Sequence, residues 1–152
     1  MILGIDPGLG GALALYEPKP LNVIVVDMPV LQLKKKALDL YALARWFDIH
    51  AGLITRAIIE DPHAMPGQGV SSMFKFGHAC GVVQAMTAAH FVPMRLVSPS
   101  HWKQRMQVTA DKDSSRLRAS QLFPAFSHLW FRSRDDGRAE AVLIAVFGAM
   151  PA

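Results

Sequence analysis

The chain has 152 residues, of which 51% are hydrophobic and 18% charged, and this composition excludes a disordered protein and suits a domain with its own core. The formal net charge of +4 favours a polyanionic partner. The chain contains no apolar run of about 18 residues, so we predict no membrane span. Cys80 is the only cysteine, and the N-terminus lacks the basic start of a secretory signal. We therefore expect a cytoplasmic protein without an intrachain disulfide.

The chain opens with a short apolar run that ends in a carboxylate. Residues 2–5 are predicted to form a strand, Asp6 follows, and the turn at residues 7–11 (Pro-Gly-Leu-Gly-Gly) leads into a second strand at 12–16. The unit is a predicted hairpin with Asp6 at its rim. A charge at the end of a buried strand is costly unless it is paired, which favours a functional Asp6. The alternative is a turn aspartate that bonds to its own backbone.

Three further strands are predicted at residues 21–27, 55–60 and 93–97, from runs rich in β-branched and apolar residues. The fourth of the five strands again ends in a carboxylate, Glu60. The first and fourth strands are almost entirely apolar, which is typical of central strands covered on both faces. Together with the helices below, these strands predict an α/β fold, a mixed five-stranded sheet flanked by helices.

Apolar spacing predicts helices over about 38–47, 71–90, 99–105, 113–122 and 136–150, whereas residues 126–134 are interpreted as loop. We expect the run Lys34–Lys36 to head the first helix, as a solvated face or as a phosphate contact. Ser71 or Ser72 is the predicted cap of the long helix. Gly77 and Gly81 recur on this helix with Ala85, which indicates close approach of another backbone, either in the core or across a dimer interface.

Four carboxylates begin or end apolar elements: Asp6, Glu60, Asp136 and Glu140. Oxygen ligands of this kind suit Mg²⁺, and two such ions can clamp the attacking and leaving oxygens of a phosphodiester. For the last two acids, capping of the final helix is the alternative explanation. The six histidines show no zinc-site spacing with the cysteine, so we do not expect zinc.

Residues 2–8 (Ile-Leu-Gly-Ile-Asp-Pro-Gly), 58–60 (Ile-Ile-Glu), 98–103 (Ser-Pro-Ser-His-Trp-Lys) and 138–145 (Arg-Ala-Glu-Ala-Val-Leu-Ile-Ala) resemble, in order and spacing, the RuvC-type Holliday junction resolvases. The resemblance covers most of the chain and implies one RuvC-like nuclease domain over residues 1–152 with an RNase H-like fold. It also implies a homodimer that binds four-way junction DNA and nicks it symmetrically, with two Mg²⁺ ions, or Mn²⁺, in each active site. The setting would be a bacterial or phage-infected cell.

By this resemblance, Asp6 and Glu60 take the first two metal-ligand places and Glu140 the last. The bacterial pattern has its last two acids three residues apart, and here the nearest candidate, Asp136, lies four residues before Glu140. In this spacing the chain resembles the phage-like branch of the family. Asp135 competes for the same place, but if the final helix includes residue 135, only Asp136 shares a face with Glu140. If residue 135 precedes the helix, Asp135 becomes an N-cap candidate instead.

By the same resemblance, Lys103 and Lys112 fall where the family has basic residues near the scissile phosphate, and Lys112 is the predicted catalytic cation. The loop 61–69 lies where the family inserts a wedge into the junction, with Met65 as an apolar tip. The expected DNA contacts are Lys103, Arg105, Lys112, Arg116 and Met65, with Lys34–Lys36 and Arg118 as further cations.

Three other functions fit parts of the sequence. A RuvC-like nuclease acting on other branched DNA or on RNA would use the same acids. A junction-binding module without cleavage would lack an acid, yet all four places are filled. The turn at residues 6–11 also resembles the phosphate loop of actin-like ATPases and sugar kinases, which need two such domains. We predict a Mg²⁺-dependent endodeoxyribonuclease that resolves four-way junctions.

Overall fold

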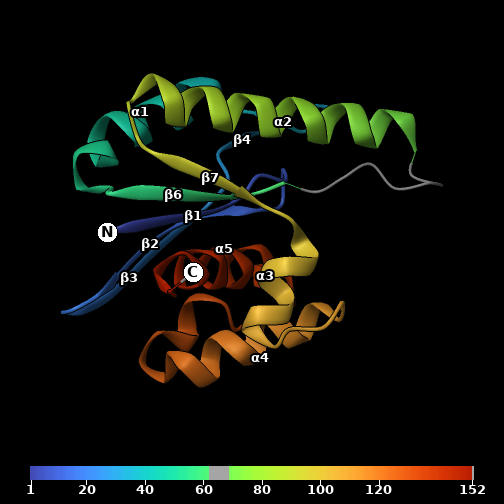
Figure 1. Ribbon diagram of the computed structural model, residues 1–152. Helices are drawn as coiled ribbons and strands as arrows, with labels where there is room; N and C mark the ends of the chain where they lie inside the picture. Colours follow the sequence, from blue (N-terminus) through green and yellow to red (C-terminus); the bar gives the residue numbers. More distant parts are fainter. Residues whose placement is uncertain (62–68, 152) are drawn as a thin grey trace.

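The computed structural model describes residues 1–61 and 69–151, and its centre is a five-stranded sheet (Figure 1). The strand order is β3-β2-β1-β6-β7. β1 pairs antiparallel with β2, and β2 with β3, whereas β1, β6 and β7 run parallel. The predicted mixed α/β sheet with apolar central strands is confirmed. The strands span Ile2–Asp6 (β1), Ala12–Pro18 (β2), Leu21–Asp27 (β3), Arg56–Glu60 (β6) and Met94–Val97 (β7).

Helices cover both faces of the sheet. In Figure 1, α1 and α2 lie on one side, and α5 with α3 and α4 on the other. No helix among residues 1–61 and 69–151 has the length and apolar character needed to cross a membrane. The helices span Leu40–His50 (α1), Val70–Ala89 (α2), Pro99–Met106 (α3), Lys112–Leu122 (α4) and Asp136–Ala149 (α5), with 3₁₀ turns at Ala51–Leu53 (η1), Pro124–Leu129 (η2) and Ser133–Asp135 (η3).

β1 divides the core into two halves because its side chains alternate between the faces of the sheet. Leu3 and Ile5 pack in the cluster under α1 and α2, and Ile2 belongs to the cluster under α5. Gly4 allows α5 to lie directly on the strand, since a side-chain carbon here would come within 2.1 Å of the carbonyl oxygen of Ala141. The absence of a side chain therefore sets the depth at which α5 packs.

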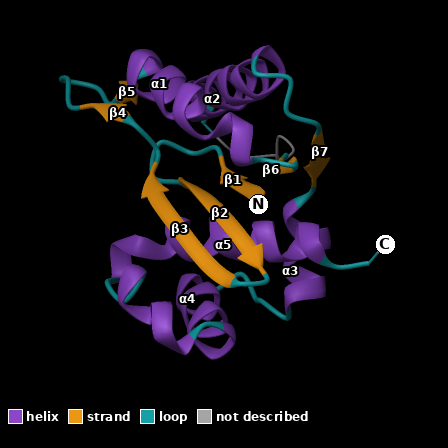
Figure 2. Cartoon of the chain, turned by 90° about the vertical axis from the view of Figure 1, so that its left-hand side faces the viewer, coloured by secondary structure: helices purple, strands orange, loops and turns teal. Residues whose placement is uncertain are grey.

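Two of the predicted helix starts are wrong. Lys34–Lys36 do not head α1; they lie between β4 (Val30–Leu31) and β5 (Ala37–Leu38), a small hairpin that projects from the molecule in Figure 2. α1 begins later because the Asp39 side chain accepts a hydrogen bond from the Ala42 N–H at 3.0 Å and caps it. α2 is capped by Gly69, without a side-chain bond, and Ser71 and Ser72 fall inside its first turn.

The interpretation of residues 126–134 as loop is also wrong, because η2 and η3 occupy most of this segment. Periodicity does not detect them, since 3₁₀ turns are too short to repeat an apolar position. On α2, the described residues do not support the core-packing explanation for the glycines. Among residues 1–61 and 69–151, nothing lies within 4 Å of a side-chain carbon placed at Gly77 or Gly81, so no other backbone in this part of the chain packs against either glycine.

Candidate active site

Two predicted acids lie at the same edge of the sheet. β1 and β6 run parallel with Ile5 opposite Ile59, so Asp6 and Glu60 end neighbouring strands side by side. Carboxyl ends of parallel strands are the usual position of sites in open α/β sheets. Asp6 also accepts a hydrogen bond from the Gly8 N–H at 3.1 Å, so the turn-aspartate interpretation holds together with the functional one.

The start of α5 reaches the same edge. A side-chain carbon at Gly137 would lie 2.4 Å from the carbonyl oxygen of Gly10, so only glycine lets the helix approach the β1–β2 turn this closely. Asp136 precedes this contact, and Glu140 follows one helical turn later, on a similar face of α5. Close backbone approach therefore brings the last two acids toward the first two.

The other three carboxylates lie close enough to Asp6 for their charges to act on it. Burial, together with the charges of Glu60, Glu140 and Asp136, raises the pKa of Asp6 from 3.8 to about 7, although the hydrogen bond from Gly8 acts to lower it. Like charges held together in this way need a compensating cation, or a proton, to be stable. Mutual repulsion of this kind is typical of functional sites.

Glu60 is buried, with 8% of its surface exposed, and its Oε1 accepts a hydrogen bond from the Trp102 indole N–H at 2.8 Å. Burial raises the pKa of Glu60 and the Trp102 bond lowers it, while the charge of Glu140 raises it and that of Lys103 lowers it. Trp102 was missed as a site residue at the sequence level. The signal was its position next to Lys103 in the segment 98–103.

Glu140 is held from two helices. Its Oε1 forms an ion pair with the Lys103 ammonium of α3 at 3.0 Å and accepts a hydrogen bond from the Ser115 hydroxyl of α4 at 3.1 Å. Ser115 is fully buried and was also missed, because an isolated serine carries no pattern that sets it apart. Lys103 therefore lies beside Glu140, and its predicted contact with DNA stays a prediction.

The donor set fits a hard divalent cation in its chemistry, because the ligands are all carboxylate oxygens. Among the described residues, however, no three Asp, Glu, His or Cys side chains are arranged so that they could hold a metal ion as they stand. Lys103 supplies positive charge at Glu140 in this arrangement. The side chains of the four acids would have to draw together around a cation.

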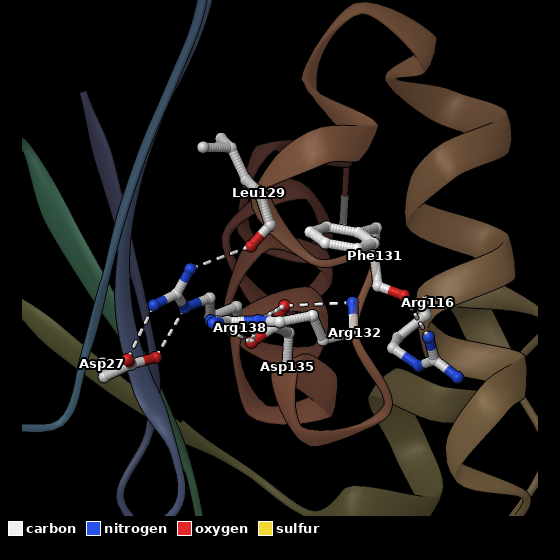
Figure 3. A network of polar contacts seen from close by, with 7 residues as sticks. All are labelled: Asp27, Arg116, Leu129, Phe131, Arg132, Asp135 and Arg138. Carbon is white, nitrogen blue, oxygen red and sulfur yellow. Dashed lines mark hydrogen bonds and ion pairs between the residues drawn. The ribbon is translucent and has the colours of Figure 1, made fainter.

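Asp135 takes no part in this cluster. Its side chain is buried, with 3% exposed, and its Oδ1 accepts a hydrogen bond from the Arg132 guanidinium at 2.8 Å, as Figure 3 shows. This bond lowers the pKa of Asp135. Asp135 occupies the N-cap position of α5, yet its side chain makes no cap bond to that helix. Its carboxylate instead stabilises η3.

A second arginine ties α5 to the edge of the sheet. The Arg138 guanidinium donates to Asp27 Oδ2 at 2.7 Å and to the Leu129 carbonyl at 3.1 Å, so it bridges β3 and η2 (Figure 3). Arg138 follows Asp136 by two residues and precedes Glu140 by two. The bridge therefore fixes the part of α5 that carries both acids.

A groove of about 760 Å³ includes two of the four acids, Asp6 and Asp136. The glycine turn at residues 8–11 and the cations Lys36 and Arg134 also line it. Both cations are exposed, and sequence reasoning did not single out Arg134. Asp27 and Asp135 also line the groove, but each is already paired with an arginine.

Several predicted DNA contacts have partners within the chain. The Arg105 guanidinium donates to the Pro151 carbonyl at 3.3 Å, and that of Arg116 donates to the Phe131 carbonyl at 2.9 Å and pairs with Asp113. The Arg118 guanidinium donates to the Met106 carbonyl at 2.9 Å. Met65 and the side chain of Lys112 lie outside the described residues. The roles proposed for these residues stay predictions.

Comparison with known proteins bears on the fold. No family model and no curated protein sequence matches the chain. Among solved structures, Thermus thermophilus RuvC in complex with a Holliday junction substrate shares 18% identity at a TM-score of 0.67, covering 97% of this chain and 93% of that one. The structure of Thermus thermophilus RuvC alone has a TM-score of 0.62 at 18% identity, and the match covers 97% of this chain and 94% of that one.

The yeast mitochondrial Holliday junction resolvase Ydc2 gives a TM-score of 0.56 at 17% identity, covering 96% of this chain and 76% of that one. The comparisons do not bear on the phage-like branch, which stays a prediction. Because the similarity extends over nearly the whole chain, the resemblance inferred from the sequence is confirmed at the level of the fold. The chain has the RNase H-like fold of the RuvC-type Holliday junction resolvases.

Proposed function

We propose that this protein is a metal-dependent, structure-selective endonuclease that resolves four-way DNA junctions by symmetric nicking, with residues 1–152 as one RuvC-like nuclease domain. The observation that carries the proposal is the convergence of Asp6, Glu60, Asp136 and Glu140 at one edge of the sheet, where their charges oppose one another. The fold shared with RuvC in complex with a Holliday junction substrate supports the choice of substrate.

The four carboxylates would hold two Mg²⁺ ions, or Mn²⁺, in each active site. When bound, such ions supply a clamp for the attacking and leaving oxygens of an in-line displacement at phosphorus. The chain's own residues orient this site: Trp102 holds Glu60, and Lys103 with Ser115 holds Glu140. Lys103 is partly exposed, so its ammonium can also contact a phosphate placed at the acids. Lys112 is proposed for the same role.

The DNA strand would continue from the acids into the groove toward Lys36 and Arg134. Phosphate contacts by exposed cations supply affinity and set the register of a bound strand without reading its sequence. The polar and charged residues that line the groove suit a sugar–phosphate backbone. On the loop after Glu60, Met65 is proposed as a wedge at the junction centre.

A homodimer would place one active site on each of the two equivalent strands of a junction. The proposed seam is the exposed stripe on α2, defined by Val70, Phe74, Gly77, Gly81 and Ala85. Val70 is 85% exposed and Phe74 77% exposed, which is unusual for apolar side chains of this size. Helical spacing places these residues on one face, and the glycines leave room for a second helix.

The deciding experiment incubates the protein with a synthetic four-way junction in Mg²⁺ or EDTA. Matched duplex, single strand, a three-way branch, a replication-fork form and a junction made of RNA serve as competing substrates. We expect paired, symmetric nicks in the junction with Mg²⁺ alone, and none with Asp6→Asn or Glu60→Gln. Equal cleavage of plain duplex, or faster cleavage of another branched DNA or of RNA, would contradict the proposal.

The compartment follows from this function and stays part of the proposal. A junction resolvase acts where recombining DNA is found, which for this chain would be the cytoplasm of a bacterial or phage-infected cell.

A further inference from the structure

We propose that Trp102 is a positioning residue that fixes Glu60 for metal binding, and this inference rests on the proposed function. The indole N–H of Trp102 donates to Glu60 Oε1 at 2.8 Å, in a buried contact between residues 42 positions apart. A carboxylate has two oxygens, and an N–H held on one of them sets the orientation of the other. Partners of this kind orient metal ligands in many metalloproteins.

The position of Trp102 gives this bond its rigidity. Its side chain is fully buried in the core cluster beneath α5, so the ring cannot follow a moving carboxylate. α3 begins at Pro99, and its first turns present Trp102 to the end of β6. Through this hydrogen bond, the rigid packing of the core fixes the position of the Glu60 carboxylate.

Lys103, the next residue, contacts a second acid of the site, Glu140. Its ammonium lies 3.0 Å from Glu140 and 5.2 Å from the centre of the Trp102 ring, a favourable cation–π arrangement. Two adjacent residues of α3 thus contact acids of two different elements, β6 and α5. α3 in this way fixes the positions of Glu60 and Glu140 relative to each other. Trp102 contributes to both contacts, by its hydrogen bond to Glu60 and by the ring on which the Lys103 ammonium lies.

A merely structural role for Trp102 is the alternative, because buried indole N–H groups need an acceptor of some kind. The chain offers a matched comparison. Trp130 is equally buried, and its indole N–H donates to the neutral hydroxyl of Ser120 at 3.0 Å, away from the four acids. If Trp102 only packs the core, the loss of either N–H will have similar consequences.

The test measures binding of Mn²⁺ alone, by titration calorimetry without DNA, to the full chain and to Trp102→Phe and Trp130→Phe. We expect Trp102→Phe to weaken Mn²⁺ binding roughly tenfold or more, since the loss of such a partner has effects of this size. Trp130→Phe should bind as the wild type does, although both variants lose thermal stability. Equal effects of the two substitutions on Mn²⁺ affinity would overturn the inference.

A second variant removes the donor while keeping the ring. Benzothienylalanine at position 102 replaces the indole N–H by sulfur with nearly unchanged shape, so it remains informative if Trp102→Phe folds poorly. We expect the same loss of Mn²⁺ affinity, and wild-type affinity would contradict the proposal. In a Glu60→Gln background the loss at position 102 should disappear. A wild-type protein that binds no Mn²⁺ would instead count against the proposed function itself.

Discussion

Among the single residues, Asp6 is the acid whose protonation should govern the stability of the metal-free protein. Its pKa rises from 3.8 to about 7 in the folded chain, chiefly through burial and then through the charge of Glu60. Between these two values the folded state binds a proton that the unfolded state has released. The free energy of unfolding should therefore fall as the pH rises from about 4 to about 7.

Asp6→Asn should remove this contribution, and the variant should be more stable than the wild type at pH 8 in EDTA. Urea unfolding of both proteins from pH 4 to pH 8 measures the difference, which should be small at pH 4 and largest above pH 7. Mg²⁺ should restore the stability of the wild type alone. Parallel pH profiles of the two proteins would disprove this account of Asp6.

The neighbours Asp135 and Asp136 should respond to the same substitution in opposite ways. Asp136→Asn should abolish cleavage, because the charge of Asp136 acts on Asp6, and the fold should be retained. Asp135→Asn should cleave within a few-fold of the wild type but lose stability, since its buried carboxylate gives up the ion pair with the partly exposed Arg132. Cleavage rates and thermal melts separate the two outcomes.

Glu140→Gln provides the companion variant on the same helix, and we expect it also to be inactive while still binding the junction. Removal of a negative charge that faces phosphate should leave binding unchanged or tighten it. An active Asp136→Asn protein beside an inactive, stable Asp135→Asn protein would reverse the assignment of the two aspartates.

At the scale of the element, α5 depends on glycine for its contact with the β1–β2 turn. Gly137→Ala would place a methyl group 2.4 Å from the Gly10 carbonyl oxygen, so helix and turn must separate. Overpacking of this kind costs about 1–3 kcal/mol. Because Asp136 moves with the helix, cleavage should fall more than junction binding. Gly52→Ala, where a side chain meets nothing within 4 Å, is the control and should change neither.

The stripe on α2 should be the dimer interface. No residue that the structure describes lies within 4 Å of a side-chain carbon at Gly81, so Gly81→Leu should fit the monomer but hold two α2 helices apart in a dimer. We expect sedimentation to show a dimer for the wild type and a monomer for the variant, with unchanged helical circular dichroism. A wild-type monomer at micromolar concentration, with or without junction DNA, would rule out the seam.

At the scale of the whole molecule, the net charge of +4 should act through particular cations rather than as a uniform field. Affinity for a junction in Ca²⁺ should fall steeply with salt, and the slope of log affinity against log salt should decrease by about one for each phosphate contact removed. Lys36→Ala and Arg134→Ala each remove a cation that lines the groove. Both should lower the slope.

Arg56→Ala is the matched control, because Arg56 is also exposed but begins β6, at the end of the strand opposite Glu60. It should leave both affinity and slope unchanged. Binding measured from 50 to 200 mM salt tests the three variants together. If the slope of log affinity against log salt is equal for all three variants, the DNA strand does not lie in the groove.

The five strands of the main sheet could be predicted from the sequence, because β-branched and apolar runs that stop at proline and glycine favour strands, whereas the short hairpin of β4 and β5 was missed. A carboxylate at the end of such a run, as at Asp6 and Glu60, also predicted which edge of the sheet carries the proposed site. The choice between Asp135 and Asp136 needed more, because it depends on where α5 begins. The short turn η3 before it gives no periodic signal.

The side chains that contact the acids could be identified only from the tertiary structure. Trp102 meets Glu60 across 42 residues, and Ser115 meets Glu140 across 25, and such contacts leave no mark in local spacing. Likewise, helical spacing predicted that Gly77 and Gly81 approach another backbone, but only the packed molecule shows that none of the described residues supplies it. Local patterns encode secondary structure because neighbouring residues decide it, whereas side-chain partners depend on how the elements pack in space.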